Sequence, residues 1–262
     1  MPEEDESIRP QQEIVHEQPK INKFAILFTI MFILGVATTV LTFHWCYAYH
    51  KGFSLESIHT EFNWHPLLSV IGFLFLYANA LLFSQVSRYL PKWFGIKISF
   101  SNEALYWVIF ITKIIVFVFI VLSIIPAVDY FNFNKYPIPH MYSLHSWLGV
   151  LALVLMITDV LLGLICFVWK RIPKHLNRIF SSVGFISSVI AFMTSVCTSV
   201  LGWKEFAIFT YGRKYGDLAN GAITINLLGL VTMAFGLLVL HLLLRKKKMA
   251  KGRTHHYNQG ES

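Results

Sequence analysis

The stretch SLHSWLGVLALVLMITDVLLGLICFVW, residues 143–169, decides the fold of this 262-residue chain. It is apolar almost throughout, with one histidine, His145, near its start and one charged residue, Asp159, further along. As a helix rising about 1.5 Å per residue, residues 145–169 are long enough to cross a hydrocarbon layer of about 30 Å. Backbone polar groups have no water to bind inside a bilayer, so such a segment must be helical. The stretch therefore predicts a membrane-spanning α-helix.

Five further blocks of this kind occur in the chain. The composition is 55% apolar and only 14% charged, whereas soluble domains carry about a quarter of their residues as charges. The apolar residues gather into separate blocks, as membrane spans require. The sequence predicts an all-α fold, a six-helix transmembrane bundle, with spans at residues 24–46, 65–86, 104–128, 145–169, 179–202 and 222–244.

The positive charges predict how the bundle is oriented. With a cytoplasmic N-terminus, the inner segments carry sixteen lysines and arginines and the outer loops carry five. This asymmetry places both termini in the cytoplasm. The predicted organisation is a disordered cytoplasmic tail at 1–23, a six-helix domain at 24–244 and a basic cytoplasmic tail at 245–262, with residues 249–262 also expected to be disordered. The polar start argues for a retained first span rather than a cleaved signal.

Several classes of function are excluded by the same composition. The net charge of +8 lies mostly beside the spans, so it reflects topology and argues against nucleic-acid binding. The three cysteines form no CxxC motif. We expect a multi-pass protein with the lipid bilayer as its environment, in the plasma membrane or in endomembrane vesicles.

Two histidines mark a candidate cofactor site. His65 lies at the entry of the second span and His145 at the entry of the fourth. Both spans run from outside to inside, so the two imidazoles are expected at similar depth near the outer face. Two imidazoles facing one another across a bundle suit a bis-histidine haem, and the small residues Gly72, Ala78, Gly149 and Ala152 would make room for it. The alternative is two interfacial histidines that hold their polar edges in the headgroup region.

Three motifs carry a family resemblance over residues 60–210. They are Phe62-Asn63-Trp64-His65-Pro66, then Tyr142-Ser143-Leu144-His145-Ser146-Trp147 with Gly149, and Leu201-Gly202-Trp203-Lys204-Glu205. With them the chain resembles the cytochrome b561 proteins, six-helix membrane haem proteins that pass electrons from ascorbate to an acceptor. The resemblance implies haem b with His65 and His145 as its axial iron ligands on the non-cytoplasmic side. It also implies an ascorbate-dependent reductase and association as a homodimer, although nothing in the sequence fixes a dimer face.

The chain departs from this family at the inner side of the membrane. The family has a second haem there, held by one histidine of the third span and one of the fifth. No histidine lies between His65 and His140. Counting from His145 to Glu205 puts Gly184 at the position of the other inner ligand. His175 is expected in the cytoplasmic loop, so one haem is predicted, with His175 or His241 as unusual inner ligands in an alternative reading.

Two residues of opposite charge lie deep in the spans, where they could form an ion pair. Lys113 is in the third span and Asp159 in the fourth, at similar depth. A buried charge is costly without a partner, so we hypothesise that the two form an ion pair in or beside the space that the inner haem would occupy. The alternative is that each finds its own polar neighbour, such as Thr112, Thr158 or Ser182.

The function predicted is that of a membrane haem-b oxidoreductase. It would transfer electrons involving ascorbate, monodehydroascorbate or ferric iron at the non-cytoplasmic face, with His140 and Tyr142 at the substrate site just before His145. The alternative is a non-redox membrane protein, a transporter or a partner subunit, on a degenerate fold of this type.

Overall fold

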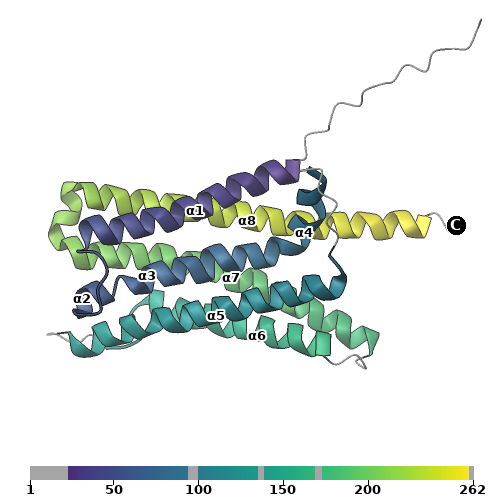
Figure 1. Cartoon of the computed structure of the whole chain (residues 1–262), viewed down its shortest axis with the longest axis horizontal. Helices are drawn as coiled ribbons and strands as arrows, with labels where there is room; N and C mark the ends of the chain where they lie inside the picture. Colours follow the sequence, from purple (N-terminus) through teal and green to yellow (C-terminus); the bar gives the residue numbers. More distant parts are fainter. Residues whose placement is uncertain (1–22, 94–99, 135–138, 169–172, 260–262) are drawn as a thin grey trace, which may run out of the picture.

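The computed structural model describes residues 23–93, 100–134, 139–168 and 173–259. These residues form long helices that run side by side (Figure 1). They are α1 (Lys23–Tyr49), α2 (Ile58–Glu61), α3 (Trp64–Ser69), η1 (Val70–Leu76), α4 (Tyr77–Trp93), α5 (Asn102–Phe133), α6 (Leu144–Val168), α7 (Lys174–Tyr211), η2 (Gly212–Asp217) and α8 (Asn220–Gln259). Among the described residues, six helical stretches are long and apolar enough to cross a membrane. The all-α, six-span prediction is confirmed.

The helices pack as two groups joined by α7. Helix α1 packs along α8, α6 packs along α7, and α3 packs against α5. Helix α7 also contacts α8, and so it links the α1–α8 pair to the α6 side of the bundle. Figure 1 shows α1 and α8 on one side and α5 and α6 on the other, with α3 and α7 between them. The interior between α3, α5, α6 and α7 is where the candidate site lies.

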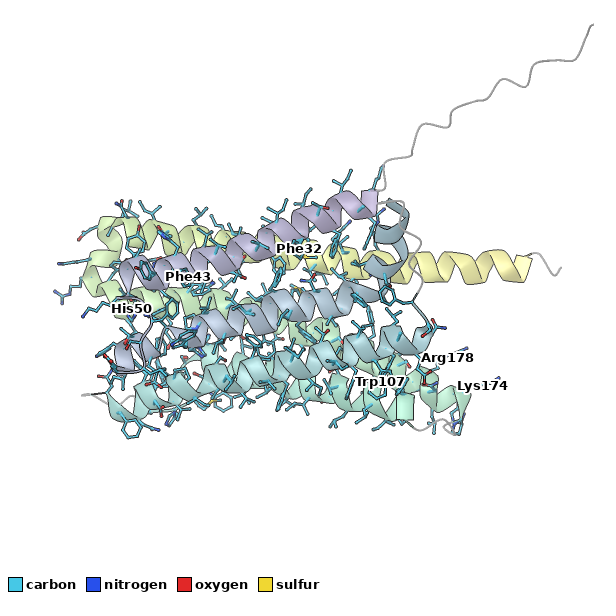
Figure 2. The ribbon with its side chains drawn as sticks, in the orientation of Figure 1. Phe32, Phe43, His50, Trp107, Lys174 and Arg178 are labelled. Carbon is cyan, nitrogen blue, oxygen red and sulfur yellow. The ribbon has the colours of Figure 1, made fainter. Side chains whose placement is uncertain are left out.

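The two ends of the bundle are distinguished by the chain termini. Helix α1 begins and α8 ends at the same end of the molecule (Figure 1), which we call the inner end. Lys174 and Arg178 lie there, whereas His50 lies at the opposite end (Figure 2), which we call the outer end. An even number of spans brings the start of α1 and the end of α8 to the same side of the bundle. That this side faces the cytoplasm stays a prediction from the charge distribution.

Most helices extend beyond their predicted bounds, and two of these extensions correct a prediction. Helix α7 begins at Lys174 rather than at 179, so His175 lies exposed in its first turn and not in a loop, which corrects the prediction. Helix α8 continues to Gln259, so residues 249–259 are helical where disorder was expected. Both extensions lie at the inner end, where a helix can continue into water because its backbone groups remain paired within the helix. The predicted tail at residues 1–22 lies outside the described residues.

The second span is not a uniform α-helix. Between α3 and α4, residues Val70–Leu76 form a π-helix, η1. The i→i+5 pattern of a π-helix is rare and is frequent at functional sites. Around a regular α-helix, His65 and Tyr77 would point about 120° apart, because twelve residues at 3.6 per turn leave a third of a turn over. The wider π turn rotates the later residues back, so that both side chains face the bundle interior.

Candidate cofactor site

His65 and His145 face each other across the outer half of the bundle. Each is the second residue of its helix, His65 in α3 and His145 in α6. Their ring centroids lie 6.0 Å apart and the ring planes are nearly perpendicular, at 88°. The structure therefore brings together the two imidazoles that the sequence singled out.

Each imidazole is held by a backbone carbonyl from a different helix. His65 Nδ1 lies 2.8 Å from the carbonyl oxygen of Ser123 on α5, and His145 Nδ1 lies 2.8 Å from that of Thr198 on α7. A carbonyl only accepts, so Nδ1 carries the proton in both rings. The lone pair of each neutral ring is then on Nε2, the arrangement that histidine metal ligands adopt.

This geometry fits a bis-histidine haem. Imidazole nitrogen to metal bonds are about 2 Å long, so two imidazoles bound to one iron have their centroids about 6 Å apart. The observed 6.0 Å agrees with that separation. Both tautomers also leave Nε2 free to bind a metal. The described residues hold no cluster of three or more histidine, cysteine, aspartate or glutamate side chains arranged to hold a metal ion.

A cavity of about 260 Å³ contains both histidines and continues to the outer mouth beside His140 and Tyr142. Gly149 and Ala152 line it as expected, whereas Gly72 and Ala78 are not among its lining residues. Trp203 also lines the cavity, and its buried indole Nε1–H has no hydrogen-bond partner among the described residues. An orphaned buried donor is costly, so this N–H suits an oxygen acceptor of whatever fills the space.

Gly72 has a packing role. A Cβ at this position would lie 2.9 Å from the Cβ of Phe119 and 3.4 Å from the carbonyl oxygen of Val116, both on α5. Because one of these atoms is backbone, the neighbour cannot simply turn away. Gly72 therefore permits the close approach of η1 and α5 and does not widen the cofactor cavity.

At the outer mouth, the two residues predicted at the substrate site each have a polar partner. His140 Nε2 lies 2.7 Å from the side-chain oxygen of Asn132 at the end of α5. The Tyr142 hydroxyl donates to the carboxylate of Glu205 on α7. Burial, and then this contact with Glu205, raise the pKa of Tyr142 well above its ordinary value. The sequence gives Glu205 as part of a motif, but its contact with Tyr142 depends on the packing of α6 against α7.

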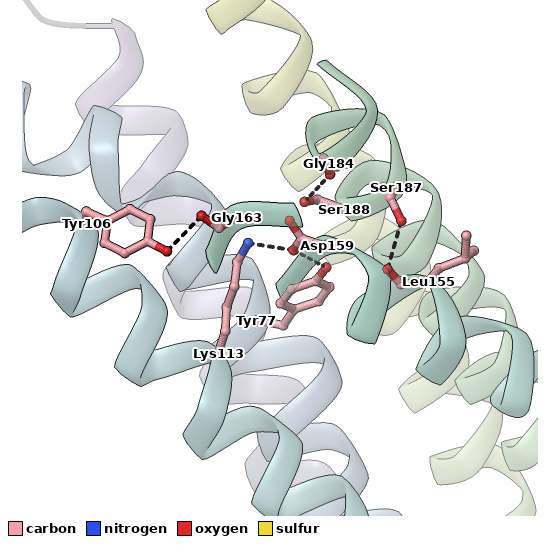
Figure 3. A network of polar contacts seen from close by, with 9 residues as sticks. All are labelled: Tyr77, Tyr106, Lys113, Leu155, Asp159, Gly163, Gly184, Ser187 and Ser188. Atoms are coloured by element: carbon pink, nitrogen blue, oxygen red, sulfur yellow. Dashed lines mark hydrogen bonds and ion pairs between the residues drawn. The ribbon is translucent and has the colours of Figure 1, made fainter. Parts of the chain in front are cut away.

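The inner half of the bundle contains a buried ionic cluster (Figure 3). Lys113 Nζ on α5 lies 2.5 Å from Asp159 Oδ2 on α6, and the Tyr77 hydroxyl on α4 donates to the same oxygen at 3.1 Å. The Lys113 and Asp159 side chains are only 13% and 6% exposed. The structure thus places the ammonium beside the carboxylate and adds Tyr77, which sequence reasoning missed because a tyrosine in an apolar span gives no distinguishing signal.

The ionic cluster adjoins the position that would carry an inner ligand. A Cβ on Gly184 of α7 would lie 3.9 Å from Asp159 Oδ1 and 3.6 Å from the Cβ of Leu162. Nearby, Ser187 donates to the Leu155 carbonyl and Ser188 to the Gly184 carbonyl (Figure 3). The other two inner candidates do not face this space.

Those two candidates are exposed at the bundle surface. His175 is exposed in the first turn of α7 and His241 is exposed on α8. Neither presents a buried imidazole to the interior between α5, α6 and α7. The geometry therefore gives no pair of histidines in the inner half within the described part of the chain.

Comparison with known proteins agrees with the six-span fold. The family model for eukaryotic cytochrome b561 matches residues 64–210. The chain is 32% identical over 213 residues to a transmembrane ascorbate-dependent reductase of Sus scrofa, covering 81% of this chain and 79% of that protein. It is 30% identical over 227 residues to a lysosomal membrane ascorbate-dependent ferrireductase of Danio rerio, covering 84% and 87%. It is 27% identical over 229 residues to a plasma membrane ascorbate-dependent reductase of Rattus norvegicus, covering 85% and 74%. With its six spans and these matches, the chain is a multi-pass membrane protein that belongs to the eukaryotic cytochrome b561 family.

Proposed function

We propose that this chain is an ascorbate-dependent membrane reductase that holds one haem b between His65 and His145 and works at the outer, non-cytoplasmic face. The observation that carries the proposal is the facing pair of imidazoles, 6.0 Å apart, with both Nδ1 atoms bound to carbonyls. The names of the relatives, which are ascorbate-dependent reductases and ferrireductases, support the reaction class.

A haem b held by His65 and His145 would supply a carrier for one electron. The other residues of the site, at the cavity mouth, would bind a small anionic substrate and exchange a proton with it. Ascorbate loses one electron and one proton when it becomes its radical, so the mouth needs a proton acceptor. With Nε2–H donated to Asn132, the Nδ1 lone pair of His140 is available for that proton. His140 returns the proton when the reaction runs toward ascorbate.

Tyr142 and Glu205 also line the cavity at this mouth. Because the Tyr142 hydroxyl donates to the Glu205 carboxylate, the two side chains tie the segment before α6 to α7. The remaining lone pairs of the carboxylate can bind a substrate hydroxyl or a ferric chelate. Acceptors of this type are monodehydroascorbate and chelated ferric iron.

With one haem near the outer face, both the oxidation of the donor and the reduction of the acceptor would take place at that face. Asp159 follows His145 by fourteen residues of α6, which is about 21 Å along the helix. Where a second carrier would be needed, the inner half has the Lys113–Asp159 ion pair and Gly184. Electron tunnelling falls steeply with distance, and the described residues of the inner half offer no second pair of histidines to hold an intermediate carrier for electrons from the cytoplasmic side. Both the donor and the acceptor then use the outer mouth.

The test is the haem content of the purified full-length chain. We expect one haem b per chain, with an absorption spectrum that changes on reduction by ascorbate, and loss of haem from His65→Ala and from His145→Ala. His175→Ala and His241→Ala are the matched controls and should keep the haem. Two haems per chain, or an undisturbed haem in both ligand variants, would contradict the proposal; a chain without haem would favour the non-redox alternative.

A further inference from the structure

The two candidate haem ligands are oriented by helices that carry no ligand themselves. His65 comes from α3 and its carbonyl partner, Ser123, from α5; His145 comes from α6 and its partner, Thr198, from α7. A carbonyl in the middle of a helix normally accepts from the amide four residues on. Each contact therefore needs a local feature that lets an imidazole reach a helix backbone.

On α7 that feature is the missing side chain of Gly202. It is one turn after Thr198, the residue whose carbonyl binds His145. A Cβ added to Gly202 would lie 2.8 Å from Cε1 and 2.9 Å from Nδ1 of His145, closer than real Cβ atoms approach other atoms. With hydrogen alone at this position, the ring packs against the helix backbone and reaches the Thr198 carbonyl.

On α5 the corresponding feature is Pro126. It lies inside the helix, three residues after Ser123, and both residues are buried on the same face. Proline has no N–H for the carbonyl of Leu122, and a proline ring inside a helix pushes against the carbonyl four residues earlier, which opens the hydrogen-bond ladder at that turn. The opening gives the neighbouring Ser123 carbonyl room to accept from His65. The Ser69 hydroxyl, one turn along the second span from His65, donates to the Ser123 hydroxyl and ties the same two segments together.

We propose that Gly202 and Pro126 are positioning residues for the two haem ligands. Gly202 gives His145 access to the Thr198 carbonyl, and Pro126 gives His65 access to the Ser123 carbonyl. These two carbonyls hold the imidazole planes perpendicular and would tune the electron affinity of a bound haem iron. The inference rests on the proposed haem ligation. An N–H···O=C contact on the far nitrogen makes an imidazole a stronger electron donor to its metal. Hydrogen bonding to the axial ligands is one of the ways a protein sets the potential of a haem. The contacts therefore favour the ferric state and lower the reduction potential.

The first measurement uses the unmodified chain. Perpendicular axial imidazole planes leave two iron d orbitals nearly equal in energy, which gives a low-spin ferric electron paramagnetic resonance signal with large g anisotropy. The 88° angle between the rings predicts this type of signal for the haem of this chain. A strongly rhombic signal, typical of parallel planes, would overturn the proposal while leaving the ligand assignment intact.

The second measurement uses two variants. Gly202→Ala places a methyl group against His145, so we expect a changed ferric signal and a raised reduction potential, with the His65 side unaffected. Pro126→Ala restores the amide that the Leu122 carbonyl lacks. The closed hydrogen-bond ladder should weaken the Ser123–His65 contact, and the variant should also have a raised reduction potential. Gly163→Ala is the control, because a Cβ there meets no atom within 4 Å although it lies on α6, as His145 does.

The outcomes separate the two proposals. A haem-free wild-type chain contradicts the proposed function. Haem-loaded Gly202→Ala and Pro126→Ala proteins with the signal and potential of the wild type contradict the positioning role alone. Loss of haem from a Gly202→Ala protein that elutes as a folded species supports it, since the ring has then been displaced from its ligating position. Should Gly202→Ala fail to fold, the wild-type signal and Pro126→Ala decide the question.

Discussion

Lys113 Nζ lies 2.5 Å from Asp159 Oδ2 in the interior of the inner half, and Tyr77 donates to the same carboxylate oxygen. Three helices, α4, α5 and α6, therefore meet at one carboxylate. A buried charge left alone costs several kcal/mol, whereas a paired one is roughly balanced by its partner. The ionic cluster thus links three helices in the inner half of the bundle.

Breaking this ion pair should be far more costly than removing it. Asp159→Asn or Lys113→Met leaves one buried charge without a partner and should destabilise the bundle by about 3–5 kcal/mol. The double variant Lys113→Met/Asp159→Leu removes both charges and should recover most of the loss. Thermal unfolding in detergent, arranged as a double-mutant cycle, measures this coupling. Strictly additive losses would show that the two side chains do not interact in the membrane protein.

The hydroxyl of Tyr77 should contribute separately to the same cluster. Tyr77→Phe keeps the ring and removes one donor to a charged acceptor, which should cost about 1.5–3 kcal/mol. The haem spectrum should not change, because the ring lies in the inner half. Tyr106→Phe, which removes a donor to the Gly163 carbonyl on the same side of the bundle, is a matched control with a neutral acceptor and a smaller expected loss.

The Tyr142–Glu205 contact predicts a dependence of stability on alkaline pH. The pKa of Tyr142 is raised above its ordinary value of 10.0, first by burial and then by Glu205. A group whose folded-state pKa is raised stabilises the fold fully below the unfolded value, and this stabilisation is lost as pH rises above about 10. Tyr142→Phe should remove this part of the alkaline transition.

Ultraviolet titration of tyrosinate checks the cause of that shift. Glu205→Gln removes the negative charge next to the phenol, so the Tyr142 pKa should fall toward its ordinary value. An alkaline transition that is the same in the wild type, Tyr142→Phe and Glu205→Gln would mean that the contact does not form at the mouth.

His140 should affect turnover but not haem binding. If its Nδ1 takes the proton of ascorbate, His140→Ala should slow ascorbate-driven reduction by on the order of 10²-fold, the lower range for general acid–base catalysis. Asn132→Ala loses only the partner that fixes the tautomer and should be affected less. Stopped-flow reduction of the haem measures both rates. An unchanged rate in His140→Ala would remove it from the reaction.

Gly72 offers a test of the fold that is independent of the cofactor. Gly72→Ala pushes a methyl group to within 2.9 Å of Phe119 on α5. Overpacking of this kind typically costs about 1–3 kcal/mol, and it should lower the thermal stability. Gly229→Ala on α8, where a Cβ meets nothing within 4 Å, should be neutral or slightly stabilising. Equal stability of the two variants would contradict the close approach of η1 and α5.

The amino-acid sequence by itself determined the number of spans, the placement of His65 and His145 near one face, and the similar depth of Lys113 and Asp159. All of these depend on distance along the chain, because hydrophobic length fixes where a helix crosses the membrane and the rise per residue fixes depth. The family followed from three short motifs around those histidines.

The tertiary structure decided which side chains meet. Contacts across helices depend on the rotation of each helix about its axis and on how closely neighbours approach, and neither is set by hydropathy. The π turn at Val70–Leu76 brings Tyr77 round to Asp159, and Gly202 lets His145 reach the Thr198 carbonyl. A π turn has no reliable sequence signal, and a glycine in a helix shows its role only when the atom beside it is known.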